Sequence, residues 1–263
     1  MTLKLTQEAL HEAMPRAPKE IIEVFVRKQA VLDKSGITEN VKRLAAFFAN
    51  LAHETNQFRI QNLTENIHYT AQRMADVWEN RFHGKAYLVV DKYGDSPGWQ
   101  KKAFDDIYGN RMGNHPGTHD GSNFIGRGGP QWTGRDGYEE LERRTGLPAT
   151  TNPDSICEFE VQPEVSAAYW DWKEMNELSD RSTFRAICIR WNGGLNGYSS
   201  RVSYYEKMLQ AFKGLGEGKG APIKEVKQPT VVQKPAAQFP TGSLLELVAN
   251  LIKSIIGLFT KGK

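Results

Sequence analysis

The most informative segment of this chain is Leu44-Ala45-Ala46-Phe47-Phe48-Ala49-Asn50-Leu51-Ala52-His53-Glu54-Thr55, a strongly amphipathic run inside a predicted helix from Glu39 to Phe58. Phe47, Leu51 and Glu54 recur at helical spacing, so they share one face of that helix. A carboxylate on an apolar stripe loses hydration and needs a compensating reason to be there. Glu54 is therefore a candidate functional residue.

A second carboxylate, Glu65, follows within Thr64-Glu65-Asn66-Ile67-His68-Tyr69. Hydrolysis of a glycosidic bond needs one protonated carboxyl to donate to the leaving oxygen, and one ionised carboxylate to activate water or attack the sugar. An apolar helix end suits the first role, because desolvation is expected to disfavour the charged form of Glu54 and to keep its proton near neutral pH. The alternative is that both are ordinary solvated carboxylates, Glu65 at a loop or a helix start.

A glycine-rich segment forms the third feature: Asn123-Phe124-Ile125-Gly126-Arg127-Gly128-Gly129-Pro130-Gln131-Trp132-Thr133-Gly134-Arg135. This density of Gly indicates a backbone that turns tightly and approaches something closely. The segment lacks the Gly-Lys-Ser/Thr and Gly-x-Gly-x-x-Gly patterns of nucleotide-binding loops. It is either a structural turn or a sugar site, to which Gln131, Trp132 and Thr133 add an amide, a stacking surface and a hydroxyl.

Five motifs in order carry a specific resemblance: His53-Glu54-Thr55, Glu65 to Ala71, Tyr108 to Asn114, Gly126 to Gly134, and Trp191 to Gly197. Together they resemble the family 19 glycoside hydrolases, and more closely the branch found in bacteriophage endolysins. The resemblance covers about residues 1–212. It implies a mostly helical, lysozyme-like fold, an inverting mechanism and no metal.

Carried over to this sequence, the resemblance implies that Glu54 is the general acid, that Glu65 is the general base, and that Thr133 helps to hold the nucleophilic water. Other positions match residues with which relatives contact the glycan or organise the carboxylates. These are His53, Tyr69, Arg127, Gln131, Asn192 and Arg201.

The sequence also departs from the family pattern at three places. Thr55-Asn56-Gln57 stands where Ser-Gly-Gly often follows the first Glu in endolysin relatives, and the stretch between the two carboxylates is slightly longer than usual. Trp132 stands where Leu is usual, and Gly137 where Asn is frequent.

Length and charge fit one catalytic domain with an appendage. The chain has 263 residues and a net charge of +3, but residues 214–263 hold seven Lys against three acidic residues. The body is therefore near neutral, and no nucleic-acid partner is expected.

Residues 1–8 contain no secretory signal, which predicts synthesis in the host bacterial cytoplasm and action on the cell wall in the periplasm after release. Cys157 and Cys188 are predicted to be reduced, buried thiols, with pairing left open.

Apolar spacing predicts helices along the body rather than strands. Trp170 and Trp172 are predicted to be packing residues. Although His53-Glu54 begins like a zinc-protease helix, position 57 is Gln, so neither a metal nor another cofactor is expected. His115 and His119 are assigned to a loop. The predicted helices are 20–32, 39–58, 71–82, 161–178 and 182–190.

Beyond the catalytic domain, residues 213–242 are rich in Gly, Lys and Pro and predict a linker. Residues 243–263 predict a cationic amphipathic helix whose polar residues share one narrow face. Its apolar run would span about 24 Å as a helix, less than a hydrocarbon core of about 30 Å. A helix lying in the membrane interface, on anionic lipid or lipopolysaccharide, is favoured, and docking on the body or on another copy is the alternative.

Two classes of function remain open at this point. The first is a glycosidase that cleaves the β-1,4 bonds of peptidoglycan glycan strands, acting as a monomer, with a chitinase acting on GlcNAc polymers as the close alternative. The second is a glycan- or membrane-binding protein without catalysis. The presence of both Glu54 and Glu65 favours the enzyme.

Overall fold

The computed structural model describes residues 2–216, which fold into helices joined by loops, with no β-strand in this range beyond isolated bridges. The predicted mostly helical fold is confirmed. Most of the predicted linker and all of the predicted C-terminal helix lie outside the described residues.

The α-helices are α1 (Gln7–Ala13), α2 (Lys19–Arg27), α3 (Gln29–Lys34), α4 (Val41–Glu54), α5 (Ala71–Val77), α6 (Glu79–Phe82), α7 (Ala86–Tyr93), α8 (Trp99–Tyr108), α9 (Asp120–Asn123), α10 (Arg135–Thr145), α11 (Gln162–Trp172), α12 (Met175–Arg181), α13 (Phe184–Asn192) and α14 (Tyr198–Phe212). Short 3₁₀ helices are η1 (Ile37–Glu39), η2 (Gln61–Leu63), η3 (Pro153–Cys157) and η4 (Phe159–Val161).

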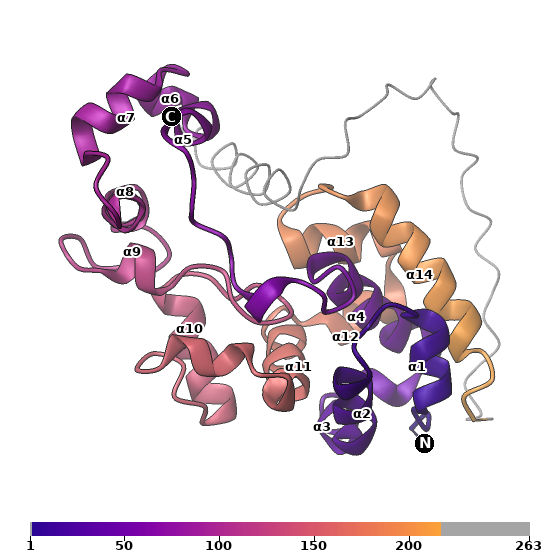
Figure 1. The fold of residues 1–263 in the computed structure, drawn as a ribbon. Helices are drawn as coiled ribbons and strands as arrows, with labels where there is room; N and C mark the ends of the chain where they lie inside the picture. Colours follow the sequence, from indigo (N-terminus) through magenta and orange to yellow (C-terminus); the bar gives the residue numbers. More distant parts are fainter. Residues whose placement is uncertain (1, 217–263) are drawn as a thin grey trace, which may run out of the picture.

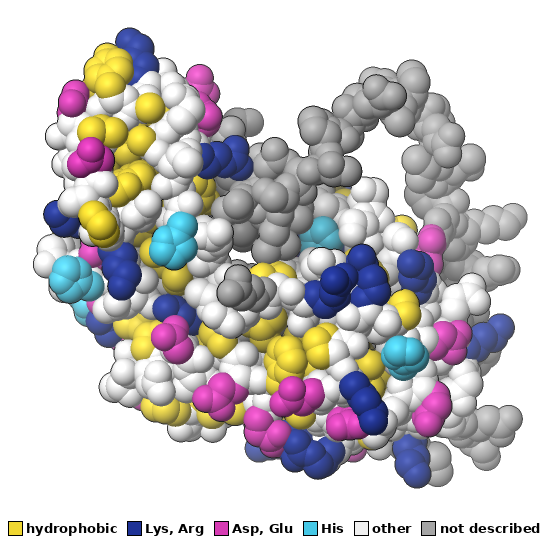
Figure 2. All heavy atoms as spheres, viewed as in Figure 1, with side chains coloured by type: hydrophobic (Ala, Val, Ile, Leu, Met, Phe, Trp, Pro, Cys, Tyr) yellow, Lys and Arg dark blue, Asp and Glu magenta, His cyan; other side chains and the backbone are white. Residues whose placement is uncertain are grey.

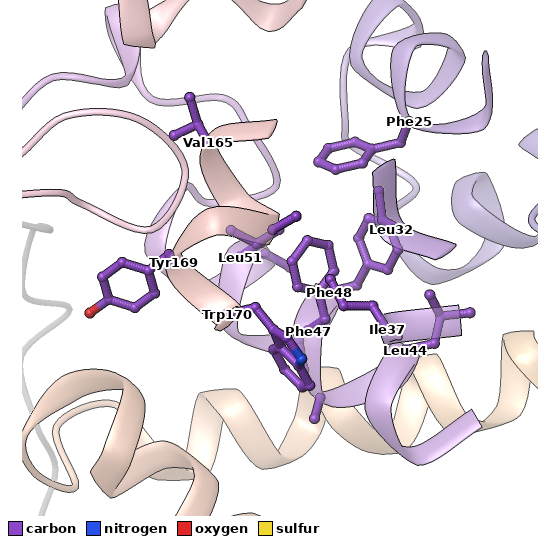
Figure 3. Close-up of a cluster of buried hydrophobic side chains, with 14 of the residues drawn as sticks. Phe25, Leu32, Ile37, Leu44, Phe47, Phe48, Leu51, Val165, Tyr169 and Trp170 are labelled. Atoms are coloured by element: carbon purple, nitrogen blue, oxygen red, sulfur yellow. The ribbon is translucent and has the colours of Figure 1, made fainter. Parts of the chain in front are cut away.

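Helix α4 is the central element of the larger body. Every residue from Leu44 to His53 is buried, so protein surrounds the helix on all sides. Its longest partner is α14, which packs along it. Figure 3 shows the aromatic core around α4, where the rings of Phe47 and Phe48 meet Phe25 and Trp170 at centroid distances of 5.1 to 6.3 Å.

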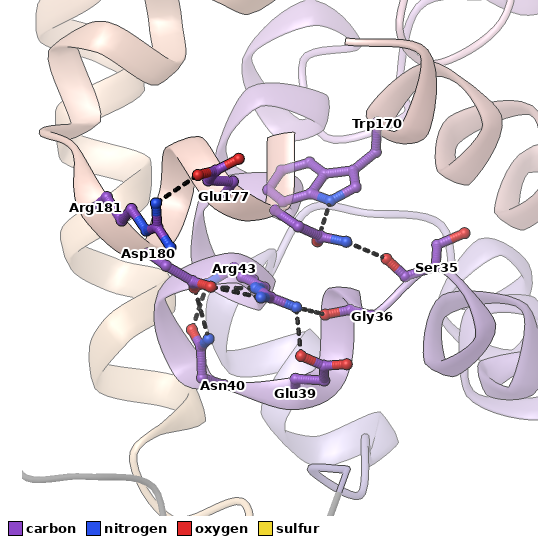
Figure 4. A network of polar contacts seen from close by, with 10 residues as sticks. Ser35, Gly36, Glu39, Asn40, Arg43, Trp170, Glu177, Asp180 and Arg181 are labelled. Carbon is purple, nitrogen blue, oxygen red and sulfur yellow. Dashed lines mark hydrogen bonds and ion pairs between the residues drawn. The ribbon is translucent and has the colours of Figure 1, made fainter. Parts of the chain in front are cut away.

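A polar network fixes the start of α4. Asn40 caps the helix by accepting a hydrogen bond from the backbone N–H of Arg43 at 3.0 Å. The Arg43 guanidinium reaches Asp180 on α12 and the carbonyl of Gly36, as Figure 4 shows. Arg43 thus ties α4 to both the preceding turn and a helix far along the chain.

A second, smaller core lies in the lobe that Figure 1 shows standing away from the body, with α5, α6 and α7 at its far end. It is built from aromatic and aliphatic residues, most of them between Ile67 and Tyr108, with Trp78, Trp99 and Phe104 among its buried side chains. Figure 2 shows apolar side chains on the visible face of this lobe. Tyr87 and Val90 of α7 are among the exposed large hydrophobic residues. No helix among residues 2–216 combines the length and apolar character needed to cross a bilayer.

Each predicted helix range coincides with helix, but most ranges contain a break. The range 20–32 is divided at Lys28, whose ψ of 22° interrupts the helical geometry, and 161–178 is divided between α11 and α12 by Glu174 at a φ of 53°. Helix α4 ends at Glu54, four residues before the predicted end. Apolar periodicity continues across such breaks because both halves pack on the same core.

The predicted packing roles of the tryptophans on α11 are confirmed. Trp170 is fully buried and Trp172 packs against the main core. Cys157 and Cys188 are both free thiols, but Cys157 is only partly buried, so the prediction of two buried thiols is correct for Cys188 alone.

A left-handed turn directly follows the helix that carries Glu54. Asn56, Gln57 and Phe58 have φ values of 48°, 61° and 59°, a conformation that costs about 1 to 2 kcal/mol per non-glycine residue. Tertiary contacts hold it in place, because the Gln57 side chain accepts from the backbone of Arg16 at 2.9 Å and Phe58 is buried in the core. Glycine adopts such φ values at little cost, which gives a physical reason for the Ser-Gly-Gly usual in relatives.

Thr55 closes this turn and is the subject of a first prediction. Its hydroxyl donates to the Leu51 carbonyl at 2.6 Å and accepts from the backbone N–H of Phe58 at 2.7 Å, with Thr55 fully buried. Thr55→Val should therefore leave a buried N–H unsatisfied and lower the free energy of unfolding by about 1 to 3 kcal/mol, measured by denaturant titration.

Thr145 provides a matched control. Its hydroxyl makes the same pair of contacts, to the Leu141 carbonyl at 2.7 Å and from the Leu147 N–H at 3.2 Å, but in a partly exposed position. Thr145→Val should cost less, because water can replace the lost partner. Equal losses for the two variants would contradict this account of the turn.

Candidate active site

Glu54 lies at the end of α4 and is bound by a buried arginine. Its Oε1 accepts a hydrogen bond from Nη2 of Arg201 on α14. The Arg201 side chain is only 2% exposed, and its Nη1 donates to Oδ1 of Asn50 at 2.7 Å. The sequence predicted apolar neighbours for Glu54, and the structure shows that its direct partner is a buried cation. Glu54 is the last residue of α4, and its carboxylate binds the buried guanidinium of Arg201. A buried cation requires an anionic or polar partner.

His53 lies beside this pair and is neutral at pH 7. Burial, followed by the charge of Arg201, lowers the pKa of His53 to about 4, against an opposing effect of Glu54. Its Nδ1 lies 3.0 Å from Oγ of Ser200. Asn192, at the end of α13, is buried nearby. Asn192 and Arg201 share one acceptor. The carbonyl of Asn196 accepts from Nδ2 of Asn192 and from Nε of Arg201 at 3.4 Å each. The predicted residues His53, Glu54, Asn192 and Arg201 thus form one group.

Glu65 lies in one of two neighbouring segments, residues 63–67 and 124–126, that both pass from the main core to the second core. Leu63 belongs to the main core and Ile67 to the second, and the same change occurs between Phe124 and Ile125. Glu65 and Gly126 are paired at this crossing. The Glu65 backbone N–H donates to the Gly126 carbonyl at 2.8 Å, and the Gly126 N–H donates to Glu65 Oε2 at 3.1 Å.

The predicted residues Gln131 and Thr133 converge on the same place. A Cβ added to Gly126 would lie 2.6 Å from Gln131 Oε1 and 3.4 Å from both Glu65 Oε2 and Thr133 Oγ1. The three oxygens therefore surround one small space that a glycine leaves open. Gln131 holds a φ of 63° in this loop, a strained conformation of the kind found at functional sites.

Burial raises the pKa of Glu65, while the hydrogen bond from the Gly126 N–H and the charge of Arg127 act in the opposite direction. A carboxylate with a raised pKa is a stronger base when ionised. Such a group suits the activation of water, provided that the pH lies above its pKa.

An aromatic row connects the two groups. The Trp132 ring meets Tyr169 edge-on at 5.1 Å, and Tyr169 meets Trp191 at 5.0 Å and donates its hydroxyl to the Trp191 carbonyl at 2.8 Å. Trp132 follows Gln131, whereas Trp191 precedes Asn192. The row therefore runs from Gln131, in the group around Glu65, to Asn192, in the group around Glu54.

Trp132 is not the sugar-stacking surface that the sequence suggested. It is fully buried, its face stacks on Trp172 at 5.0 Å, and its indole N–H donates to the Val165 carbonyl at 3.0 Å. The larger ring fills a space between α11 and the glycine-rich loop, because Trp172 offers it a flat partner.

Two predicted substrate-contacting residues point into the protein. Arg127 is 8% exposed, and it donates through Nε to Asp154 at 2.8 Å and through Nη1 to Tyr138 at 3.0 Å. This placement favours a role in holding the loop. Tyr69 is 4% exposed, with its ring in the second core, which favours organising the site over contacting a glycan.

Sequence reasoning missed residues that hold the neighbours of Glu54, namely Arg201, His53 and Asn192. Asn50 is fully buried and precedes Glu54 by one helical turn, so a polar amide within the apolar run was a usable signal. Ser200 and the carbonyl of Asn196 gave no such signal. Within residues 2–216, no three His, Cys, Asp or Glu side chains converge in a way that could hold a metal ion.

Comparison with known proteins adds one relative. The chain is 27% identical over 210 residues to a glycosyl hydrolase family 19 domain-containing protein of Haemophilus influenzae, an alignment that covers 80% of this chain and 98% of the relative. No family model matches the chain. The helical fold is consistent with a lysozyme-like glycoside hydrolase domain, and the similarity supports a relationship with the family 19 glycoside hydrolases.

The buried pair of Arg201 and Glu54 gives a second prediction. Glu54→Leu should leave the guanidinium without its anionic partner and lower the free energy of unfolding by roughly 3 kcal/mol. Glu54→Gln keeps an acceptor oxygen and should cost much less. Both changes are measured by denaturant titration.

Glu177 serves as the control, because it pairs with Arg181 on an exposed face, at 73% and 77% exposure. Glu177→Leu should change stability little, since exposed ion pairs contribute little. A Glu54→Leu variant as stable as Glu54→Gln would show that Arg201 does not depend on this carboxylate.

Proposed function

We propose that this protein is a peptidoglycan-degrading endolysin that hydrolyses β-1,4 glycosidic bonds by an inverting acid/base mechanism. The observation that carries this proposal is the separate anchoring of two carboxylates. Glu54 is held through Oε1 by Arg201, and Glu65 through Oε2 by the Gly126 N–H. Within residues 2–216 the second oxygen of each accepts no hydrogen bond, so each carboxylate keeps one oxygen for substrate or water.

The proposed roles follow from these positions. In this proposal the donor is the protonated form of Glu54, with its proton on the oxygen that Arg201 does not bind. Glu54 passes this proton to the glycosidic oxygen as the leaving sugar departs, and Glu65 takes a proton from the water that attacks the anomeric carbon on the opposite face. Thr133 and Gln131, beside Glu65, would help to orient this water. Arg201 is also bound to Asn50, so it keeps its place when Glu54 turns to the glycan.

Sequence features support peptidoglycan as the substrate. The ordered motifs resemble the endolysin branch of the family, and residues 243–263 carry the pattern of a cationic amphipathic helix. In this proposal the protein is a monomer made in the cytoplasm of a bacterial host. It acts in the periplasm after release, and residues 243–263 bind the membrane or lipopolysaccharide. Chitin is the alternative substrate, because it shares the β-1,4-linked GlcNAc unit.

The test is digestion of purified peptidoglycan and of chitin, with identification of the new reducing-end sugar and its anomeric configuration by NMR. We expect peptidoglycan cleavage with inversion. Glu54→Gln should lose about 100- to 10,000-fold in rate, because the amide cannot donate a proton, and Glu65→Gln should be damaged to a similar degree.

Glu177→Gln, on the exposed face, is the control and should retain the wild-type rate. A retained anomer, or a folded Glu54→Gln variant with more than a tenth of wild-type activity, would refute the acid/base assignment. Cleavage of chitin alone would replace the endolysin by a chitinase. Absence of cleavage of either polymer, with binding preserved, would favour a non-catalytic glycan-binding protein.

The proposed membrane role of the C-terminal segment has its own test. Truncation after Gly216 removes residues 217–263 and keeps Leu215, which packs on the core. We expect hydrolysis of purified peptidoglycan to be retained, while binding to anionic liposomes is lost, because each Lys near a charged surface contributes about 1 kcal/mol.

Charge reversal of Lys253, Lys261 and Lys263 in the full chain is the matched variant. It should weaken liposome binding without changing the length of the segment. Unfolding of the truncated protein, or undiminished liposome binding, would show instead that the segment is a structural part of the body.

A further inference from the structure

Two tyrosine hydroxyls in the second core are buried and have no hydrogen-bond partner among the described residues. They belong to Tyr69, which is 4% exposed, and Tyr108, which is 8% exposed. Leaving a buried hydroxyl unsatisfied costs free energy. With the indole N–H of Trp78, three such groups lie in one cluster, which indicates that polar partners are shared there.

Ring packing fixes where these hydroxyls lie. Tyr69 contacts Trp78 at 5.6 Å and Phe104 at 5.9 Å, and Tyr108 contacts the same two rings at 6.2 Å and 5.5 Å. The backbone is also held, since Gln100 donates to the Tyr69 carbonyl at 3.1 Å. Neither ring can turn to find another partner without opening the core.

Glu65 lies at the edge of the core that holds both tyrosines, because it pairs with Gly126, the neighbour of Ile125 in that core. Burial is the main cause that raises the pKa of each tyrosine, and the negative charge of Glu65 is the second cause in both cases. Tyr69 also raises the pKa of Tyr108, and both rings contact Trp78 and Phe104, so the two side chains lie in one part of the core. At neutral pH both hydroxyls are therefore protonated and able to donate.

Glu65 has a matching need for donors. An ionised carboxylate accepts about four hydrogen bonds, whereas Glu65 receives the Gly126 N–H on Oε2 and nothing on Oε1 from the described residues. A water that accepts from the two tyrosine hydroxyls and donates to Oε1 would give all three groups a partner, and it would leave the second lone pair of Oε1 for the water that is activated in the proposed function. It would have the two to four polar partners that a buried water needs.

We propose that Tyr108 is a positioning residue for Glu65. Its hydroxyl, with that of Tyr69, holds one buried water against the free carboxylate oxygen of Glu65. This arrangement orients the carboxylate and stabilises its ionised form, the form that a general base requires. The inference deepens the proposed function and rests on it only for the kinetic part of the test.

Other charges around this cluster set the background for any pH effect. Arg127 favours the ionised form of Glu65, and Tyr138 also feels the charge of Glu65. On the tyrosine side, Arg73 acts on Tyr69, whereas Arg111 and Arg81 act on Tyr108. All of these groups are kept when only the Tyr108 hydroxyl is removed.

The test is Tyr108→Phe in the full chain, with the pKa of Glu65 measured by NMR on protein labelled with ¹³C-glutamate and its signal assigned with Glu65→Gln. Loss of the hydroxyl should raise the pKa of Glu65 by about one unit, because a hydrogen bond to the charged form is lost. A base works only when ionised, so the acidic limb of the pH–rate profile should move to higher pH by the same amount.

Tyr93→Phe is the matched control. Tyr93 is also 8% exposed in the second core, but its hydroxyl donates to Asp106 Oδ2 at 2.6 Å. This variant should leave the pKa of Glu65 and the acidic limb unchanged. A shift of equal size in both variants would assign the effect to loosening of the lobe and overturn the proposal.

An unchanged pKa of Glu65 in a folded Tyr108→Phe variant would also overturn it. If Tyr108→Phe fails to fold, Tyr69→Phe is the second variant, because it removes the other hydroxyl on the same water. It must then raise the pKa of Glu65 for the proposal to stand. A wild-type protein without hydrolytic activity would refute the proposed function alone, since the NMR titration would still decide the role of Tyr108.

Discussion

The buried charge of Arg201 is the constraint on which the rest of the site depends. A guanidinium stays protonated in proteins, so a side chain that is 2% exposed must find acceptors from the elements around it. Asn50 and Glu54 supply them from α4, and the carbonyl of Asn196 from the loop before α14. The packing of α14 along α4 therefore fixes the carboxylate of Glu54 as a consequence of folding. Under the proposed function, Arg201 therefore serves both stability and chemistry.

Glu65 is held by a different principle. Its position comes from backbone pairing with Gly126 at the place where both segments pass from one core to the other. One carboxylate is thus fixed by the body, and the other by the junction between the body and the lobe. The spacing between them is set by how the two cores join, and the row of Trp132, Tyr169 and Trp191 lies between the two sides.

The helical fold was predictable because apolar periodicity records which faces are buried, and every predicted helix range contains helix. The breaks between helices were not predictable, since Lys28 and Glu174 interrupt the helical backbone without changing the spacing of apolar residues. The resemblance assigned Glu65, Gln131 and Thr133 to one predicted site, and the structure brings one oxygen of each around Gly126. The surroundings of Glu54 could not be derived locally, because its partner lies 147 residues away in the sequence.

Backbone strain lies close to both carboxylates, and its location has a physical explanation. Asn56, Gln57 and Phe58 follow Glu54 with positive φ, and Gln131 has positive φ beside Glu65. Such residues persist only where surrounding contacts over-determine the conformation. Here the contacts are the buried hydroxyl of Thr55 and the convergence of Gln131 on Gly126. Ending α4 at Glu54 by a tight left-handed turn, rather than continuing the helix, brings the chain back toward Glu65 within few residues. The strain is therefore the local cost of placing two carboxylates from one stretch of sequence on two different supports.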